Sequence, residues 1–487
     1  MILAIDQGTT GTRAILYSRA GKVVSQAYQE IRQYYPRPGW VEHDPEEIWN
    51  SVLKVVEEAL SRGRIRASQI AAIGITNQRE TTILWDRKTG RSVHRAIVWQ
   101  DRRTAEICRQ LKRYEPEARR ITGLVLDPYF SGTKISWLLR NNSSIARSAR
   151  AGRLVFGTPD SWLLWRLTGG RVHATDVTNA SRTLLLDLET LSWSASMMKL
   201  LSVPPVLLPK VFPSSHRFGV TARVGPLPSG IPITGIAGDQ QAALFGQGCT
   251  EPGQAKNTYG TGCFLLMQTG RRIIRSRHGL ITTAACDSKG QPAYALEGSV
   301  FIAGAAIQWL RDGLGILKKA ADSETLARSV PDTGGVYLIP AFVGLGAPYW
   351  RPDARGLICG ITRGTGRAHL ARAALESIAY QSQELVHAME KDSRIRLKSL
   401  KVDGGAVKND FLLRFQSDLC GVPVVRPKNV ETTALGAAQL AGIGVGFWSP
   451  RDLSQMRQVD RIFHPTWKPA QRKAALSGWQ QAIHRAL

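Results

Sequence analysis

Runs of apolar residues alternate with glycine- and threonine-rich turns from the start of the chain. Residues 2–5 form an apolar run, residues 6–12 read Asp-Gln-Gly-Thr-Thr-Gly-Thr, and residues 13–17 form a second strand-like run. Short apolar runs bounded by turn residues predict strands. The chain is therefore expected to open as strand, turn, strand, and residues 70–76 and 82–85 predict two further strands.

A helix is predicted directly after Asp44. This aspartate suits the N-cap, Pro45 suits the first helical position, and Glu47 completes a capping box. Apolar residues then recur at helical spacing and predict one buried stripe, made of Ile48, Trp49, Val52, Val55, Val56 and Ala59. Further helical patterns cover residues 301–314, 369–390, 408–420 and 433–445. Alternating strands and helices indicate an α/β fold.

The opening pattern returns near the middle of the chain. Residues 257–263 read Asn-Thr-Tyr-Gly-Thr-Gly-Cys and precede an apolar run over residues 264–267. A strand-turn-strand element in each half suggests a weak internal duplication, with the active cleft between the halves. Because 487 residues are too many for a single core, we expect two domains, residues 1–249 and 250–487.

The chain is strongly basic, with 64 Lys and Arg against 38 Asp and Glu and a net charge of +26. Such a charge can attract nucleic acids, anionic membranes or anionic substrates. The basic residues are scattered, however, and no zinc finger, RNP motif or heptad zipper accompanies them, so no nucleic-acid partner is expected. The long uncharged stretches, residues 333–350 and 432–450, are interrupted by proline or glycine and do not predict membrane spans. Without a signal-peptide pattern, a cytoplasmic location is expected.

Cysteine and histidine spacing gives no sign of a metal centre. The six cysteines stand singly, without a C-x-x-C pair, and the nine histidines show no close metal-binding spacing. Neither a zinc site nor a dense disulfide framework is therefore expected.

Two devices for binding nucleotides, the P-loop and the Rossmann fingerprint, have no match in the chain. The two Gly/Thr turns are the alternative, because backbone N–H groups and the hydroxyls of Thr9, Thr10 and Thr261 can donate to phosphate oxygens. An ordinary hairpin is the competing interpretation of each turn. Residues 402–409, which hold a glycine pair before a predicted helix, form either a third anion site or a plain strand-to-helix turn.

Charged residues at the ends of predicted strands are the candidates for chemistry. Asp6 and Asp239 follow apolar runs, and a carboxylate there suits Mg²⁺ binding or proton acceptance; Asp239 also suits a helix cap. Arg79 and Glu80 lie between two predicted strands and offer donors and acceptors to a polyol, with Trp99 as an apolar wall. A surface ion pair and a core tryptophan are the alternatives.

Longer motifs resemble those of the FGGY carbohydrate kinases, and the resemblance covers almost the whole chain. They include Tyr-Phe-Ser-Gly-Thr-Lys at residues 129–134, Thr-Asn-Gln-Arg-Glu-Thr-Thr at 76–82, Gly-Asp-Gln-Gln-Ala-Ala-Leu-Phe at 238–245 and His-Leu-Ala-Arg-Ala-Ala-Leu-Glu at 369–376. The resemblance implies an actin-like (ribonuclease-H-like) α/β fold of two domains that close over a cleft. It also implies phosphorylation of glycerol to sn-glycerol 3-phosphate by ATP with Mg²⁺.

The same resemblance assigns expected roles to individual residues. Asp239 would be the catalytic base that accepts the proton of the attacking hydroxyl, and Asp6 would hold Mg²⁺, with Asp239 as a possible second ligand. The glycerol site would comprise Arg79, Glu80, Trp99, Tyr129, Asp239, Gln240 and Phe264. The nucleotide site would comprise Thr9, Thr10, Gly11, Arg13, Thr261, Gly304, Gln308, Gly405 and Asn409.

One position and one segment depart from the pattern of the family. Gly11 stands where many members have Ser or Thr, so one side-chain contact to phosphate would be lost. Residues 224–230, Val-Gly-Pro-Leu-Pro-Ser-Gly, lack the arginine with which some bacterial members bind fructose 1,6-bisphosphate. Regulation by this bisphosphate is therefore not expected. The protein is expected to form a homodimer or homotetramer.

Other functions remain alternatives at this point. Another polyol or ketose kinase of the same family would share most motifs. An actin-like filament, a chaperone or a sugar-responsive DNA-binding protein would share the nucleotide turns, but such proteins lack the polyol-binding set around Arg79 and Glu80.

Overall fold

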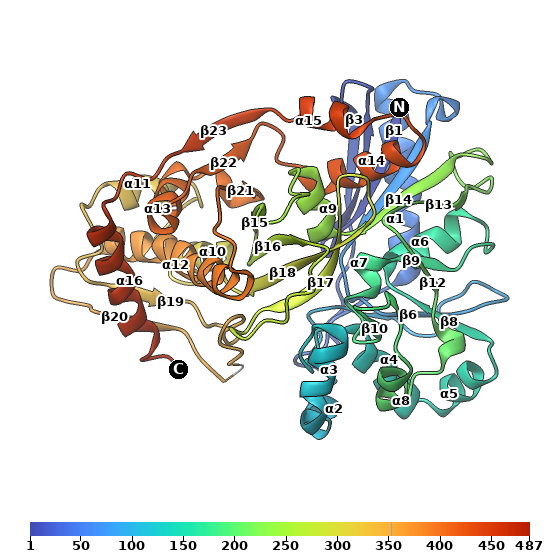
Figure 1. The fold of residues 1–487 in the computed structure, drawn as a ribbon, viewed down its shortest axis with the longest axis horizontal. Coiled ribbons are helices and arrows are strands. Elements are labelled where there is room, and N and C mark those ends of the chain that lie inside the picture. Colours follow the sequence, from blue (N-terminus) through green and yellow to red (C-terminus); the bar gives the residue numbers. More distant parts are fainter. Residues whose placement is uncertain (352) are drawn as a thin grey trace.

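The computed structural model describes residues 1–351 and 353–487, and its framework is two mixed β-sheets, one from each half of the chain (Figure 1). Strand β1 pairs antiparallel with β2 and parallel with β5, so the predicted strand-turn-strand opening is confirmed. The strands of the first sheet are, in order, β13 (Ser215–Val220), β14 (Pro232–Gly238), β5 (Ala72–Asn77), β1 (Ile2–Gln7), β2 (Gly11–Tyr17) and β3 (Val23–Glu30).

The second sheet repeats the central unit of the first. Its hairpin β15–β16 and the parallel neighbour β21 correspond to β1, β2 and β5, so each half begins with a hairpin beside a parallel strand. The strands of this sheet are, in order, β17 (Ile281–Cys286), β18 (Pro292–Val300), β16 (Cys263–Gly270), β15 (Ala255–Tyr259), β21 (Leu400–Asp403), β22 (Val424–Pro427) and β23 (Val459–Phe463).

Five short strand pairs complete the β-structure of the described residues. They are β4 (Glu42–His43) with β7 (Ala96–Ile97), β6 (Ile83–Asp86) with β8 (Leu154–Gly157), β9 (Ala174–Asp176) with β12 (Lys210–Phe212), β10 (Leu186–Asp187) with β11 (Ser192–Trp193), and β19 (Tyr337–Ile339) with β20 (Leu357–Cys359).

Helices cover both sheets, and the four segments predicted as helices in the second half are α10, α12, α13 and α14. The helices of the first half are α1 (Pro45–Gly63), α2 (Ala105–Gln110), α3 (Glu115–Thr122), α4 (Ser131–Asn141), α5 (Ser143–Arg150), α6 (Pro159–Leu167), α7 (Val177–Ala180), α8 (Ala195–Leu201) and α9 (Asp239–Gly246). Those of the second half are α10 (Gly304–Asp312), α11 (Asp322–Arg328), α12 (Arg367–Ser393), α13 (Asp410–Cys420), α14 (Thr432–Gly444), α15 (Pro450–Gln455) and α16 (Pro469–Ile483).

Helix α1 begins where the sequence predicts, but not with the predicted capping box. The Asp44 side chain accepts a hydrogen bond from the backbone N–H of Glu46 at 2.8 Å. The Glu47 carboxylate is not used in the cap, because it accepts a hydrogen bond from the Tyr34 hydroxyl at 2.6 Å. A tertiary contact has replaced the local one, and the predicted apolar stripe from Ile48 to Ala59 is buried.

The first sheet is covered by helices from opposite ends of the chain. Helix α1 packs on the face that carries Leu3 and Ile5, whereas α9 and α14 pack on the face that carries Ile2 and Ala4. Figure 1 shows α14 and α15, in red, beside the blue strands of the first sheet. A Cβ atom at Gly74 would lie 2.2 Å from the carbonyl oxygen of Ala437, so this glycine allows the close approach of α14. The predicted domain division at residues 249 and 250 stays a prediction.

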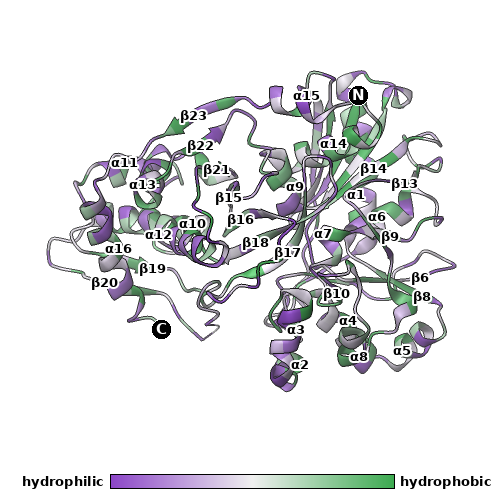
Figure 2. Ribbon diagram, viewed as in Figure 1, coloured by the Kyte–Doolittle hydropathy of each residue, from purple (hydrophilic) through white to green (hydrophobic). Residues whose placement is uncertain are grey.

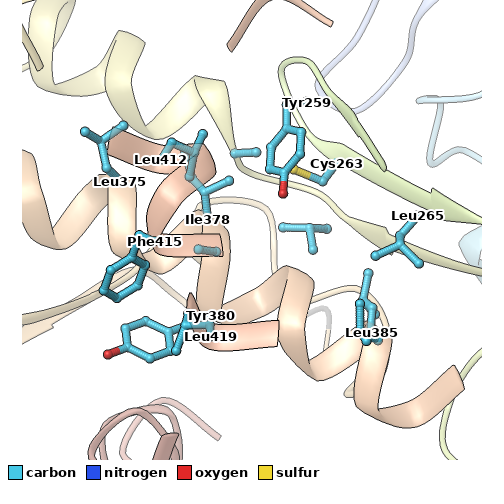
Figure 3. Close-up of a cluster of buried hydrophobic side chains, with 14 of the residues drawn as sticks. Tyr259, Cys263, Leu265, Leu375, Ile378, Tyr380, Leu385, Leu412, Phe415 and Leu419 are labelled. Atoms are coloured by element: carbon cyan, nitrogen blue, oxygen red, sulfur yellow. The ribbon is translucent and has the colours of Figure 1, made fainter. Parts of the chain in front are cut away.

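The second sheet packs against α12 and α13. Figure 3 shows side chains from the β15–β16 hairpin meeting those of both helices, namely Tyr259, Cys263, Leu265, Leu375, Ile378, Tyr380, Leu385, Leu412, Phe415 and Leu419. Figure 2 shows hydrophobic and hydrophilic positions interleaved along the peripheral helices, as expected for helices with one buried side. Within residues 1–351 and 353–487, no helix combines the length and the apolar character needed to cross a bilayer.

Candidate functional site

The residues predicted to bind a polyol meet at the start of α9. Asp239 is the first residue of this helix, and its Oδ1 accepts a hydrogen bond from the backbone N–H of Gln240 at 2.7 Å. Arg79, from the loop after β5, has its Nε 3.2 Å from the same Oδ1. The side chain of Asp239 is 31% exposed and that of Arg79 only 2%. The Asp239 carboxylate is therefore the accessible end of a buried polar group.

A buried cluster of two arginines and two glutamates lies behind Asp239. Arg79 donates to both carboxylate oxygens of Glu297, with N···O distances of 2.7 and 2.8 Å. Arg182 donates from Nε to Oε1 of Glu80 at 2.5 Å, and its Nη2 lies 3.3 Å from Oε1 of Glu297. Because Glu297 comes from β18 and its partners from the first half, these ion pairs join the two halves of the chain.

Electrostatics within this cluster hold Glu297, Arg79 and Arg182 in their charged forms. Burial acts to raise the pKa of Glu297, but the charges of Arg182 and Arg79 lower it to about 2. Burial acts to lower the pKa of Arg79, but Glu297 and Glu80 hold it well above its ordinary value. Burial raises the pKa of Glu80 because the two arginines only partly offset the loss of solvent. The alternative of a surface ion pair is therefore wrong for Arg79 and Glu80, both of which are buried.

The backbone of Glu80 is in the left-handed region, with φ of 61°. This conformation is uncommon for a residue other than glycine and costs of order 1–3 kcal/mol. Two hydroxyl groups stabilise it by donating to the Glu80 carbonyl oxygen, from Ser131 Oγ at 2.9 Å and from Thr82 Oγ1 at 3.1 Å. Such backbone strain is common at functional sites, where the surrounding structure holds a side chain in a fixed orientation.

The cluster leaves a few polar atoms for a ligand. A guanidinium has five N–H donors. In Arg79, Nε faces Asp239, Nη1 donates to Glu297 and to Gln241 Oε1 at 3.1 Å, and Nη2 donates once, to Glu297. Within the described residues, one Nη2 hydrogen of Arg79 and the Oε2 atom of Glu80 have no hydrogen-bond partner. A small polyol could therefore find a donor and an acceptor there, beside the Asp239 carboxylate.

Three aromatic rings lie together near these polar atoms. The ring centroid of Trp99 is 5.6 Å from that of Tyr129 and 6.3 Å from that of Phe264, with edge-to-face geometry in both pairs. Burial and the nearby Glu80 charge raise the pKa of Tyr129, so its hydroxyl stays protonated at neutral pH. The indole Nε1 of Trp99 donates to Thr9 Oγ1 at 2.8 Å, which connects this apolar wall to the first Gly/Thr turn.

Gln240 is oriented by a buried lysine that the sequence analysis did not select. The Nζ of Lys256, on β15, donates to Gln240 Oε1 at 2.5 Å and to Thr258 Oγ1 at 2.7 Å. Burial lowers the pKa of this ammonium group, although Asp403 and Asp239 act to raise it. Because Lys256 occupies the amide oxygen, Gln240 keeps its Nε2 donor for a ligand.

The first Gly/Thr turn joins β1 to β2 and places charged side chains side by side. The N–H of Gly8 donates to the carbonyl oxygen of Gly11 at 2.9 Å, which closes the turn around Thr9 and Thr10. Asp6 and Arg13 are cross-strand partners in the hairpin. Arg13 forms an ion pair with Glu431, which lies just before α14.

Asp6 has the properties of a ligand for a divalent cation. Burial raises its pKa to about 7, Arg13 acts to lower it, and the carboxylates of Asp239 and Glu431 act to raise it. The local excess of negative charge favours a cation, and Mg²⁺ uses one or two carboxylates together with phosphate oxygens and water. Within residues 1–351 and 353–487, no cluster of three or more His, Cys, Asp or Glu residues forms a complete metal cage. Asp6, with Asp239 nearby, therefore fits a metal held jointly with a nucleotide.

The second Gly/Thr turn lies against the start of α10. The backbone N–H of Gly304 donates to the carbonyl oxygen of Gly260 at 3.0 Å, and that of Ala305 to Thr261 at 3.1 Å. Gln308 follows one turn later on α10 and is exposed. These contacts place three of the predicted nucleotide residues at one end of the second sheet.

The third glycine-rich element adjoins the same end of the sheet. Gly404 has φ of 92°, and a Cβ atom there would lie 2.5 Å from the carbonyl oxygen of Tyr259. A Cβ atom at Gly405 would meet nothing within 4 Å, so the backbone is open at that position. Asn409 caps α13 by accepting from the N–H of Leu412 at 2.9 Å. The structure thus brings Gly405 close to the second turn.

Sequence reasoning missed Arg182, Glu297 and Lys256. Glu297 and Lys256 are single charges within otherwise apolar or uncharged strands, and such isolated charges are a signal that could have been used. Arg182 follows α7 in a short polar segment and offers no comparable signal, because its role depends only on its distant partners.

Two family models match the chain. They are described as the N-terminal domain and the C-terminal domain of the FGGY family of carbohydrate kinases, and they match residues 1–246 and 255–445. A glycerol kinase of Symbiobacterium thermophilum is 58% identical, with coverage of 100% of this chain and 98% of that protein. Glycerol kinase 2 of Thermotoga maritima is 56% identical with the same coverage.

Solved structures show the same similarity at the level of the fold. The crystal structure of Plasmodium falciparum glycerol kinase with ADP matches with a TM-score of 0.94 and 39% identity, over 100% of this chain and 98% of that one. A ligand-bound xylulose kinase of Lactobacillus acidophilus matches with a TM-score of 0.88 and 22% identity. The arrangement of the two sheets is therefore shared with structures whose substrates differ.

Proposed function

This chain belongs to the FGGY family of carbohydrate kinases, with the actin-like fold of that family, and we propose that it transfers the γ-phosphoryl group of ATP to glycerol, giving sn-glycerol 3-phosphate and ADP. Full-length relatives at 58% and 56% identity are glycerol kinases. The observation that carries the proposal is the meeting of a partly exposed carboxylate, Asp239, with buried polar groups and a wall of aromatic rings.

Glycerol offers three hydroxyl groups and little apolar surface, so directional hydrogen bonds must supply its recognition. In the proposed site the remaining Nη2 donor of Arg79, Oε2 of Glu80, the Tyr129 hydroxyl and Nε2 of Gln240 bind these hydroxyls. The carbon skeleton lies against Trp99 and Phe264. These groups come from both halves of the chain, which are tied together here by Glu297.

Asp239 is the proposed catalytic base. Its carboxylate accepts the proton of the attacking glycerol hydroxyl as the oxygen forms a bond to the γ-phosphorus, and the bond from that phosphorus to the bridging oxygen of ADP breaks. Arg79, 3.2 Å from Asp239 Oδ1, holds the carboxylate in place. Alignment is the main requirement, because phosphoryl transfer needs positioning and charge neutralisation more than covalent help from the protein.

The nucleotide site that we propose uses the two Gly/Thr turns and the third glycine-rich element. Thr9, Thr10, Gly11 and Arg13 donate to phosphate oxygens, and the other contacts come from Thr261, Gly304, Gln308, Gly405 and Asn409. Asp6, with Asp239 as a possible second ligand, would hold Mg²⁺. When bound, the metal supplies positive charge that offsets the charge developing on the phosphoryl oxygens.

Glycerol-dependent ADP formation tests the function directly. A coupled assay with and without glycerol distinguishes the kinase from a filament, chaperone or DNA-binding protein that only hydrolyses ATP. A comparison of kcat/KM for glycerol, dihydroxyacetone, erythritol and xylulose then distinguishes it from other kinases of the family. A higher kcat/KM for any of the other three substrates would overturn the assignment of glycerol.

We further infer that the protein acts in the cytoplasm, where ATP is available, as a homodimer or homotetramer. Light scattering of the purified protein measures that state. We also propose that fructose 1,6-bisphosphate does not regulate it, because two prolines within residues 224–230 remove N–H donors and the segment carries no cation. Saturable inhibition at micromolar bisphosphate in 0.15 M salt, relieved by changes in this segment, would contradict that proposal.

A further inference from the structure

The phenol ring of Tyr28 fills the space that a side chain at position 11 would need. A Cβ atom built on Gly11 would lie 2.5 Å from the Tyr28 hydroxyl oxygen and 2.6 Å from its Cε2. The same atom would lie 2.5 Å from the carbonyl oxygen of Gln29. Any larger residue at position 11 would therefore require both the Tyr28 ring and the backbone of Gln29 to move.

Strand register places the Tyr28 ring on the face of the sheet that carries Asp6 and Arg13. Asp6 pairs with Arg13 across β1 and β2, and Arg13 pairs with Tyr28 across β2 and β3. Residues directly opposite one another in antiparallel strands have side chains on the same face. Gly11 precedes Arg13 by two positions and belongs to that face as well. The Tyr28 ring therefore lies over the first Gly/Thr turn, on the side of the proposed metal ligand.

The environment of Tyr28 suits a phosphate contact. Tyr28 is 45% exposed, and its hydroxyl has no hydrogen-bond partner within the part of the chain that the structure describes. The Arg13 guanidinium carbon lies 5.4 Å from the ring centroid, in range for a cation–π contact. A hydroxyl beside an arginine and a turn with exposed hydroxyl groups can donate to an anion that binds there.

We propose that Tyr28 is a nucleotide-binding residue whose hydroxyl donates to a phosphate oxygen. It replaces, from the edge strand β3, the hydroxyl that a Ser or Thr side chain at position 11 would provide. The inference rests on the proposed function in one respect, namely that the turn from Gly8 to Gly11 holds the phosphates of ATP or ADP. It adds a contact that comes from a strand outside the glycine-rich turns.

Substitution Tyr28→Phe tests the proposal, because it removes only the hydroxyl oxygen and keeps the ring over Gly11. The affinity for ADP with Mg²⁺, measured by titration calorimetry without turnover, should fall about tenfold or more, as expected for a lost hydrogen bond to a charged group. The melting temperature without nucleotide should stay within the error of the wild type. Tyr35→Phe is the matched control, since Tyr35 is 68% exposed and its hydroxyl binds Gln33.

A second variant separates the hydroxyl from the packing of the ring. Tyr28→Phe removes the hydroxyl alone, whereas Tyr28→Ala removes both the hydroxyl and the ring. If the hydroxyl makes the phosphate contact, the two variants should weaken ADP binding by the same factor within twofold; a loss seen only with Tyr28→Ala would show that the ring, and not the hydroxyl, supports binding.

The outcomes distinguish this proposal from the proposed function. If Tyr28→Phe binds ADP within twofold of the wild type, the ring only covers Gly11 and the proposal is wrong. If the wild type shows no glycerol-dependent ADP formation but Tyr28→Phe still weakens ADP binding, the proposed substrate fails and the phosphate contact stands. If Tyr28→Ala does not fold, Tyr28→Phe decides the question by itself.

Discussion

The buried glutamate of β18 gives the sharpest test of the site. Glu297 has an exposed fraction of 0% and is bound by both terminal nitrogens of Arg79. Substitution Glu297→Gln keeps the shape but removes the charge, which leaves two buried guanidinium groups with Glu80 as their remaining buried partner. Breaking a buried ion pair by removing one partner costs roughly 3–5 kcal/mol.

The lowered pKa of Glu297 gives a second magnitude for the same ion pairs. A pKa lowered from 4.5 to about 2 corresponds to roughly 3 kcal/mol of native-state preference for the carboxylate. Both routes lead to an expected loss of about 3 kcal/mol in the free energy of unfolding at neutral pH. Because the native pKa is depressed, this stabilisation is present above the ordinary pKa of 4.5 and is lost as the pH falls towards 2.

Urea unfolding and steady-state kinetics measure the two consequences. We expect Glu297→Gln to be less stable by about 3 kcal/mol and to raise the KM for glycerol, because Arg79 loses its anchor. Glu384→Gln is the matched control: burial raises the pKa of Glu384 to about 7, and its carboxylate accepts from Tyr349 and Gln480 and not from arginine. If the two variants are equally stable at pH 8, the ion pairs of Glu297 do not stabilise the fold. If Glu297→Gln leaves the KM for glycerol unchanged, Glu297 does not anchor Arg79 for substrate binding.

Three further substitutions test the other proposed roles. Asp239→Asn should lower kcat by about 10²-fold or more while ADP affinity is kept, and a variant with over half the wild-type kcat would exclude Asp239 as the base. Arg79→Lys should lower kcat/KM for glycerol by roughly 10- to 100-fold with little change in the KM for ATP. A larger change in the KM for ATP than in kcat/KM for glycerol would indicate that Arg79 binds the nucleotide. Asp6→Asn should abolish Mg²⁺-dependent turnover and raise the melting temperature of the metal-free protein at pH 8. Burial raises the native pKa of Asp6 from 3.8 to about 7, so the wild type loses stability as this carboxyl ionises. The rise in melting temperature caused by Asp6→Asn should therefore shrink as the pH falls from 7 to 4. A constant rise over this range would contradict the burial of an ionised Asp6.

The strands and the long helices could be predicted from the local pattern of apolar residues, because these residues must be buried. Apolar runs such as residues 2–5 and the stripe from Ile48 to Ala59 must be buried wherever they lie in the chain, so their periodicity reports the element directly. The cap at Asp44 is equally local. The capping box at Glu47 failed because Tyr34, 13 residues earlier, competes for the same carboxylate, and no local pattern contains that contact.

The polyol-binding candidates were available from the sequence, but their supporting residues were not. Arg79 and Glu80 are neighbours in the chain and so attract notice as a pair. Their partners Arg182 and Glu297 lie 102 and 218 positions away, and each is an isolated charge whose meaning depends on the fold. The same holds for Tyr28, which appears as an ordinary strand residue until the sheet register places it over Gly11.

The contacts of the buried cluster explain how the Asp239 carboxylate is held at its accessible end. Arg79 and Arg182 carry two positive charges, Glu297 carries a negative charge, and Oε1 of Glu80 accepts a hydrogen bond from Arg182. The Asp239 carboxylate adds a negative charge at the exposed end, 3.2 Å from Arg79 Nε. Arg79 can therefore orient this carboxylate while its own charge is already offset by Glu297. The buried glutamates therefore fix the Arg79 guanidinium and, through it, the position of the Asp239 carboxylate that we propose as the base.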